Sequence, residues 1–346
     1  MAAPADTSRP RGGAASRAAS RRAERAPSGG WRTIAGKEMA DHLGSIRFVV
    51  LLVVVAIAAV VPMYFISSDI SAAAPQLAGQ PAIFLALFVA GSQSVGSVTT
   101  ITFTALFVPL VGIAFGFDGI NSERSQGTLS RLLAQPIHRD DVVNGKFAAG
   151  IAVIALMVGV LIAFVTALGI LRLGIIPGPE ELARVFVWFL ATVLYASFWL
   201  AFALLISTAI RSTASAALVG FGTWLALILF GGFLLPALAG VLFPLDTSGT
   251  PDAILAANNA QHIFLRLSPA TLYQDVVTAV MNPNTHNLLG LGNLGQYTAA
   301  QEQIPNLLSL DQSILLVWPQ VVALVALTTL LFALAYVLFL RQEVRA

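Results

Sequence analysis

The sequence predicts an all-α polytopic membrane protein with six transmembrane helices, and two observations support this fold class. Hydrophobic residues make up 57% of the 346-residue chain and charged residues only 10%, which is far from the composition of a soluble domain. Six continuous apolar runs also reach the roughly 20 residues that a helix needs to cross a hydrocarbon core. They lack the alternating pattern of membrane strands, so helices are favoured over a barrel. The runs lie at about 48–67, 97–117, 147–171, 185–207, 214–236 and 314–340.

The positive charges orient these spans, because cytoplasmic segments retain Lys and Arg. With the N-terminus inside, the cytoplasmic segments contain 16 of the 19 Lys and Arg residues, and only Arg172, Arg184 and Arg266 fall outside them. We therefore expect a multi-pass protein of the cytoplasmic membrane with both termini in the cytoplasm. Its large extracytoplasmic segment covers residues 237–313, and the absence of Cys leaves that segment without a disulfide.

The chain begins with a polar tail. Residues 1–30 consist mainly of Ala, Arg, Ser, Pro and Gly, a composition that cannot bury a core, so we expect them to be disordered. Their Arg residues fit either a solvated tail or a tether to anionic lipid. From Trp31 onward apolar residues recur at helical spacing. This pattern predicts a helix over 31–46 that lies in the cytoplasmic membrane interface.

Several function classes are disfavoured by what the predicted spans lack. They contain no Asp, Glu, Lys, Arg or His, the residues that usually mark proton relays and ion sites, so a proton- or sodium-coupled transporter is disfavoured. The four His residues show no metal-ligand spacing, and we expect no metal site. The pairs Gly36-Lys37 and Gly145-Lys146 lack the remaining residues of a phosphate-binding loop. This chain is therefore not expected to bind a cofactor or to hydrolyse ATP itself.

One strongly polar segment, from Asp118 to Lys146, separates the second and third apolar runs. Its first residues can form a helix that Gly127 interrupts within about three turns, so this helix is too short to cross the membrane. Pro136 then forces a turn, and Asp140-Asp141 offer a cap at the start of the third span. Four acidic and four basic residues cancel here, which favours docking to a protein surface over adsorption to lipid. A well-capped connecting loop is the alternative.

Fifteen positions in this segment and directly before it resemble the cytoplasmic signature of the type-2 exporter permeases of ABC transporters, a family that includes copper-processing permeases. The residues that carry the resemblance are Phe117, Asp118, Ile120, Glu123, Arg124, Gly127, Thr128, Leu129, Leu132, Leu133, Pro136, Ile137, Arg139, Gly145 and Lys146. It extends more loosely to the helix at 31–46, the number of spans and Leu267-Ser268-Pro269. The outer segment 237–313 carries little that matches.

The resemblance implies that residues 31–346 form the permease half of an ATP-driven exporter. Such a permease pairs with a second copy, as a homodimer or a heterodimer, and docks on a separate ABC ATP-binding subunit that holds ATP and Mg²⁺. No nucleic-acid partner and no catalytic residue are expected in this chain. The coupling segment that the resemblance implies, 118–146, contains the contact residues Asp118, Glu123, Arg124, Gly127, Thr128, Leu132, Leu133, Pro136 and Arg139, and Arg211 belongs to a second, smaller contact.

The resemblance also implies individual roles within the coupling segment. Glu123 and Arg124 would make polar contacts, either with the ATPase or with the neighbouring interfacial helix. Gly127 would provide the bend, and Leu132 and Leu133 would be apolar anchors.

Polar and aromatic residues form two stripes at helical spacing in the spans. The first stripe fits either a substrate path or simple packing, because Ser and Thr often bond their own backbone in hydrocarbon. It consists of Gln93, Ser97, Thr100 and Thr104. Packing is favoured for the second stripe, which consists of Trp188, Thr192, Tyr195 and Trp199. Close helix packing is likewise expected at the pair Gly112 and Gly116.

Two other function classes stay open from the sequence. One is a membrane anchor or assembly factor that docks a soluble partner without transporting anything, and the other is a membrane-embedded enzyme. The enzyme lacks a reactive residue with a base beside it. An ATPase encoded beside this chain would favour the transporter over the anchor. The sequence does not indicate which substrate is moved.

Overall fold

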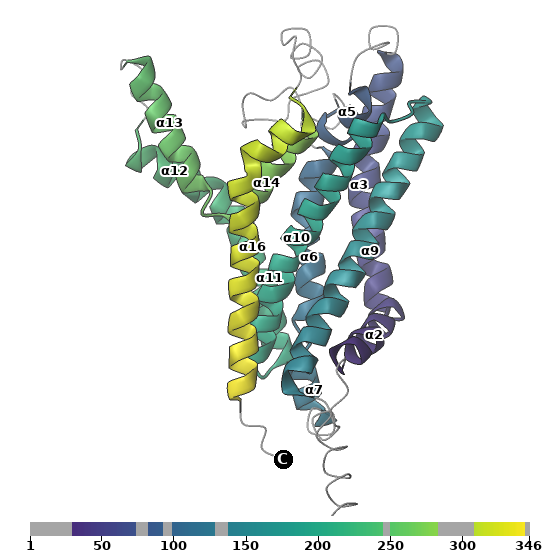
Figure 1. Cartoon of the computed structure of the whole chain (residues 1–346), viewed down its shortest axis with the longest axis vertical. Coiled ribbons are helices and arrows are strands. Elements are labelled where there is room, and N and C mark those ends of the chain that lie inside the picture. Colours follow the sequence, from purple (N-terminus) through teal and green to yellow (C-terminus); the bar gives the residue numbers. More distant parts are fainter. Residues whose placement is uncertain are drawn as a thin grey trace, which may run out of the picture.

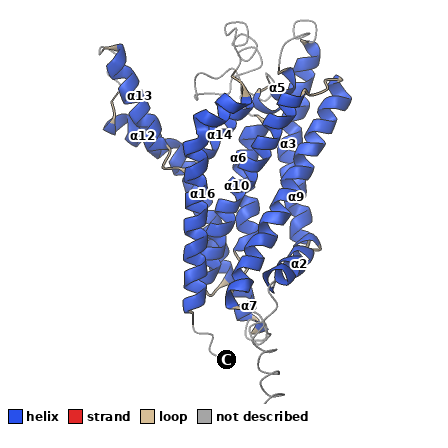
Figure 2. Cartoon of the chain, viewed as in Figure 1, coloured by secondary structure: helices blue, strands red, loops and turns tan. Residues whose placement is uncertain are grey.

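The computed structural model describes residues 30–73, 82–92, 99–128, 138–244, 250–282 and 308–342. Within these residues the chain is helical and contains no strand (Figures 1 and 2). Six helical stretches in the described part are long and apolar enough to cross a membrane, which confirms the predicted number. They are Ile46–Ala72 (α3), Thr100–Ser125 (α6 and α7), Arg139–Leu173 (α9), Pro179–Ala209 (α10), Thr213–Leu242 (α11, η1 and α12) and Leu310–Arg341 (α16).

Helix α10 occupies the centre of the bundle. In its most apolar stretch 67% of the residues are buried inside the chain, against 6% in the corresponding stretch of the fifth span. Helix α10 packs against α6, α9, α16 and the short helix α14 (Pro269–Met281). The fifth span combines α11 (Thr213–Ala226), a π-helical turn (η1, Leu227–Gly231) and α12 (Gly232–Leu242). It lies at the periphery, so most of its apolar surface touches no other part of the described chain.

Two glycines bring α6 (Thr100–Gly116) unusually close to α10. A Cβ atom at Gly112 would lie 2.5 Å from the carbonyl oxygen of Ala196, and one at Gly116 would lie 2.7 Å from Ala203 Cβ. Both distances are shorter than van der Waals contact, so the crossing requires residues without a side chain. The close packing predicted for this pair is confirmed.

The N-terminal helix α2 runs from Gly30 to Leu43 and ends before the predicted boundary at residue 46. Ser45 explains the difference, because its hydroxyl accepts a hydrogen bond from Phe48 N at 3.2 Å and thereby caps the start of α3. Helix α2 packs on α9 through Ile34, which lies against Gly145 so closely that a Cβ there would be 2.7 Å from Ile34 Cγ2. Figure 1 shows α2, α7 and the end of α16 at the same end of the bundle.

Two short buried helices fill the opposite end of the bundle, near the start of α16. Helix α5 (Ile83–Val89) buries six of its seven residues, and α14 buries most of its second half. Arg184 of α10 joins α14 to α16, because it donates to Val280 O at 2.7 Å and to Ser313 Oγ at 3.3 Å. Helix α13 (Pro251–Leu265) projects away from this end (Figure 1).

Two charges that lie just outside the predicted spans are buried in extensions of the spanning helices. Lys146 is 6% exposed and Arg184 is 2% exposed. Lys146 is helical because α9 begins at Arg139, well before the apolar run at 147–171. The predicted acidic cap is confirmed at that start, where His138 N donates to Asp141 Oδ2 at 3.2 Å. The apolar run thus marks only the middle of this helix.

Candidate functional site

The polar segment between the second and third spans begins with a helix of little more than one turn. Helix α7 covers Asn121–Ser125, and Gly127 follows it with a φ of +68°, a conformation that favours glycine. The predicted short helix and its interruption at Gly127 are therefore confirmed. Ser207 of α10 fixes the start of this helix, because its hydroxyl accepts hydrogen bonds from Ile120 N at 2.9 Å and Asn121 N at 3.2 Å. The segment is thus attached to the central helix of the bundle.

A buried lysine joins the segment to two further helices. Lys146 Nζ of α9 lies 2.7 Å from Glu123 Oε1 in α7 and 2.8 Å from Glu38 Oε1 in α2. The side chain of Lys146 is 6% exposed, and those of Glu38 and Glu123 are 13% and 18% exposed. Because little water screens these charges, the two ion pairs depend on one another. Among the described residues, Glu123 Oε2 has no hydrogen-bond partner.

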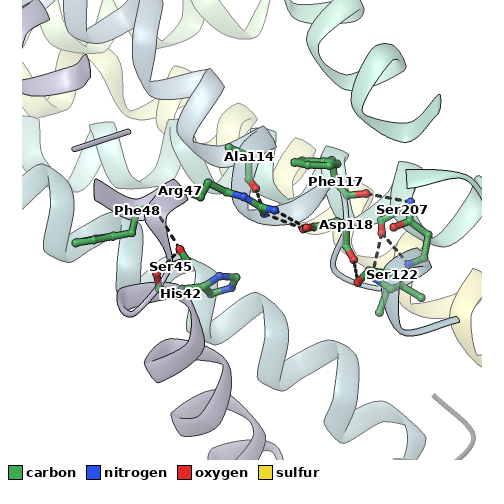
Figure 3. A network of polar contacts seen from close by, with 11 residues as sticks. His42, Ser45, Arg47, Phe48, Ala114, Phe117, Asp118, Ser122 and Ser207 are labelled. Carbon is green, nitrogen blue, oxygen red and sulfur yellow. Dashed lines mark hydrogen bonds and ion pairs between the residues drawn. The ribbon is translucent and has the colours of Figure 1, made fainter. Parts of the chain in front are cut away.

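A third ion pair holds the beginning of the segment (Figure 3). Arg47 of α3 binds Asp118 with both branches of its guanidinium, Nη1 to Oδ1 at 3.0 Å and Nη2 to Oδ2 at 2.6 Å. The same guanidinium donates to Ala114 O at 2.8 Å and lies 5.0 Å from the centre of the Phe117 ring. This bidentate geometry fixes the orientation of the two side chains as well as the distance between them. The first span is therefore attached to the point where the second span ends.

The ion pairs around Lys146 and the pair of Arg47 with Asp118 line one polar cleft between α2 and the segment. Ser45 Oγ donates to His42 O at 2.7 Å, and the His42 ring meets the edge of Phe115 with centroids 5.0 Å apart. Burial lowers the pKa of His42 below its ordinary value, more strongly than the carboxylates of Glu38 and Asp118 raise it. The cleft is lined by Lys37, Glu38, Asp41, His42, Ser45, Ile46, Arg47, Asp118, Gly119, Ser122, Glu123 and Lys146.

The other side of the segment contacts the end of the last span. Arg124 Nη2 donates to the side-chain oxygen of Gln342, which follows α16, and Arg139 Nη1 donates to the carbonyl oxygen of Gln342 at 3.4 Å. Arg211 is exposed in the short connection between α10 and α11. Gln342 is not recognisable from the sequence, since no pattern distinguishes a glutamine at the end of an apolar run.

The remaining predicted contact residues are only partly described. Thr128 Oγ1 donates to Glu123 O at 3.2 Å beside the exposed bend. Leu132, Leu133 and Pro136 lie outside the described residues, and their contact with an ATPase stays a prediction. Within the described part of the chain, no group of three or more His, Asp and Glu residues is placed to hold a metal ion.

The predicted polar stripe of the second span is half described. Thr100 and Thr104 are buried, with Thr100 Oγ1 donating to Leu87 O at 3.3 Å and Thr104 Oγ1 to Thr100 O at 2.7 Å. Both hydroxyls thus have partners within the chain. Gln93 and Ser97 lie outside the described residues, and the path for substrate stays a prediction.

The aromatic stripe of the fourth span packs against α14. Trp188 Nε1 donates to Tyr273 Oη at 3.1 Å, and Thr192 Oγ1 lies 2.9 Å from the same oxygen. The ring of Tyr195 stacks on Tyr273 with centroids 4.5 Å apart. The packing predicted for this stripe is confirmed at these three residues.

Comparison with known proteins identifies the family of the chain that contains this charged network. Residues 32–344 match the family described as ABC-2 family transporter protein. The chain belongs to this family. The ABC-2 permeases are the transmembrane components of ABC transporters, and ATP hydrolysis lies in a separate subunit. This chain is accordingly a multi-pass membrane protein, and the resemblance seen in the polar segment is confirmed.

One relative carries a more specific name. The chain is similar to the probable ABC transporter permease protein NosY of Stutzerimonas stutzeri, with 31% identity over 135 residues. That match covers 38% of this ABC-2 permease and 48% of the relative. The chain thus spans about half the length of the curated relative that it matches.

Proposed function

We propose that this ABC-2 permease is one half of an ATP-driven exporter, in which residues 118–139 dock on a separate ATP-binding subunit and a second permease copy completes the transporter. The observation that carries the proposal is the attachment of the segment to the bundle. Arg47, Lys146 and Ser207 hold it from three different helices. A displacement of the segment therefore acts on all three helices together. Coupling needs only that the ATP-bound and ATP-free subunits favour different permease conformations.

The distribution of exposure along the segment supports docking on its outer side. Residues 125–128 are exposed, whereas Glu123 points to Lys146 inside the chain. Of the two roles that the resemblance implies for Glu123, the structure favours the one inside the permease, because Glu123 is linked to the interfacial helix through Lys146 of α9, which also binds Glu38 of α2. The docking surface would then consist of the exposed bend and the apolar anchors that follow it.

The proposal is tested by replacing one of the predicted anchors. The full chain is expressed with the ATP-binding subunit encoded beside it and purified in mild detergent. We expect Leu132→Asp to lose that subunit, because a desolvated apolar contact would become a buried carboxylate. Leu267→Asp is the matched control, since Leu267 is 69% exposed in the turn between α13 and α14, at the opposite end of the bundle. Subunit stoichiometry and the ATP hydrolysis rate are measured for both.

Two results would count against the proposal in different ways. Wild-type retention of the ATPase by Leu132→Asp would exclude the segment as the docking site. A complex that assembles but hydrolyses ATP at the rate of the isolated subunit would support the alternative function, a membrane anchor that binds a partner without transporting a substrate.

A further inference from the structure

Gln342 occupies a junction between four helices at the end of the last span. It is the first residue after α16 (Leu310–Arg341), and its side chain lies between α7 and α10. Its amide oxygen accepts a hydrogen bond from Arg124 Nη2, and its amide nitrogen donates to Thr208 O at 2.7 Å. Its backbone oxygen accepts from Arg139 Nη1 of α9 at 3.4 Å. One residue therefore links the polar segment, the central helix and the last span.

The chemistry of an amide suits this position. Thr208 lies in the last turn of α10, where backbone carbonyls have no partner in their own helix. Satisfying Thr208 O requires a donor, and binding the Arg124 guanidinium requires an acceptor. A primary amide offers both, whereas a carboxylate offers only the acceptor and an aliphatic side chain offers neither. The bond from Arg124 is also charge-assisted and therefore stronger than one between neutral groups.

The junction has a separate apolar part that does not depend on Gln342. Phe339 of α16 is 3% exposed and packs in one cluster with Ile120, Val142 and Val143. Further along α16, the rings of Phe332 and Phe147 stack with centroids 4.3 Å apart. These contacts keep α16 against α9 when the polar link is removed. A variant of Gln342 is thus expected to fold with α16 in place.

We propose that Gln342 is a positioning residue that transmits displacement of the polar segment to α16 and to the end of α10. The inference rests on the proposed function, because the ATP-binding subunit supplies the displacement. Arg124 moves with α7, and Gln342 makes the end of α16 follow it. Without an acceptor for Arg124 at this position, the segment moves while α16 keeps its place.

The absence of Cys allows this link to be tested with single spin labels. Ser125→Cys reports on the exposed end of α7, and Val337→Cys, 43% exposed, reports on α16. Each labelled chain is first shown to retain its ATP-binding subunit, because Ser125 lies beside the proposed docking surface, and is then compared without nucleotide and with trapped ATP. In the otherwise unchanged chain we expect both spectra to respond to nucleotide. With Gln342→Leu, the Ser125 response should persist and the Val337 response should be lost.

Two further variants separate transmission from a general effect on the fold. Gln342→Glu keeps an acceptor for Arg124 and should restore the Val337 response. Arg341→Gln changes the neighbouring residue, which is exposed and whose side chain makes no hydrogen bond or ion pair with the other described residues, and should leave both responses unchanged.

The possible outcomes distinguish this inference from the function on which it rests. A Val337 label that responds equally in the Gln342→Leu and unchanged chains would overturn the inference and leave the proposed function standing. Loss of both responses in Gln342→Leu would assign Gln342 to docking instead of transmission, and would also overturn it. A Ser125 label that ignores nucleotide even in the unchanged chain would contradict the proposed function and the inference together.

Discussion

At the scale of single residues, Lys146 determines how the polar segment meets the bundle. Its ammonium group is almost fully buried and forms ion pairs with two carboxylates from different helices, Glu123 at 2.7 Å and Glu38 at 2.8 Å. Burying such charges costs free energy that only close pairing offsets. Removing one partner of the pair therefore destabilises the fold more than replacing the whole pair by apolar residues would. The same residue stands beside Gly145, which gives α2 room to approach. Packing and charge thus act at adjacent positions.

We expect Lys146→Met to lower the free energy of unfolding by about 3–5 kcal/mol, because Glu123 would lose its ion-pair partner and Glu38 would keep only the exposed Lys37, 3.7 Å away. Lys37→Met is the matched control. Lys37 is 65% exposed and pairs with Asp41 at 2.9 Å and more loosely with Glu38 at 3.7 Å, surface contacts that contribute at most about 1 kcal/mol each. Thermal unfolding in detergent measures both. Equal losses in the two variants would show that the buried network does not stabilise the fold.

At the scale of helices, the crossing of α6 and α10 positions the polar segment. Gly112 and Gly116 bring the two backbones together, and Ser207 of α10 then reaches the backbone N–H groups at the start of α7. The spacing of these glycines is visible in the sequence, but their partner is not. Four other spanning stretches could have met α6 as closely, and only the folded chain selects α10.

We expect Gly112→Ala to destabilise the bundle by about 1–3 kcal/mol, the usual range for overpacking. The new Cβ would lie 2.5 Å from a backbone oxygen, which cannot move aside as a flexible side chain would. Gly222→Ala in α11 is the control, because no atom beyond its chain neighbours and its own helix backbone lies within 4 Å of the added methyl group. Alanine favours helix over glycine by up to about 1 kcal/mol, so that control should match or exceed the wild-type melting temperature. A tolerated Gly112→Ala would mean that α6 and α10 separate easily.

At the scale of the whole molecule, the described network gathers at one end of the bundle. Helix α2, helix α7 and the end of α16, which Gln342 follows, lie there, and the connection between α9 and α10 lies at the other end (Figure 1). The 16 Lys and Arg residues assigned to the inside predict that this end is cytoplasmic. Docking of an ATP-binding subunit requires the same orientation, so topology and proposed function can be tested together.

Single Cys residues can report the orientation, because the chain contains no other thiol. We expect Ser125→Cys, on the exposed end of α7, to react with a membrane-impermeant maleimide only from the cytoplasmic side. Ile176→Cys should react only from outside, since Ile176 is 81% exposed in the connection between α9 and α10. Labelling of both positions from one side would contradict the six-span topology.

The sequence by itself determined the number of spans, the family and the short interrupted helix. A hydrocarbon core accepts only long apolar runs with satisfied backbones, so six spans can be read from composition along the chain. Gly127 and Asp141 act on their immediate neighbours, and local pattern therefore predicted both roles. The helix boundaries were less accurate, because α9 continues through polar residues that a hydropathy pattern leaves out.

Only the tertiary structure decided which partners the charged residues find. Glu38 and Lys146 are 108 positions apart, and Arg124 and Gln342 are 218 positions apart. Periodicity describes which face a residue occupies on its own helix, and it carries no information about which other helix lies opposite. For that reason Glu123 could be assigned either to the ATPase or to the interfacial helix from the sequence. Its ion pair with Lys146, and the junction at Gln342, exist because close helix crossings bring these distant residues within hydrogen-bond distance.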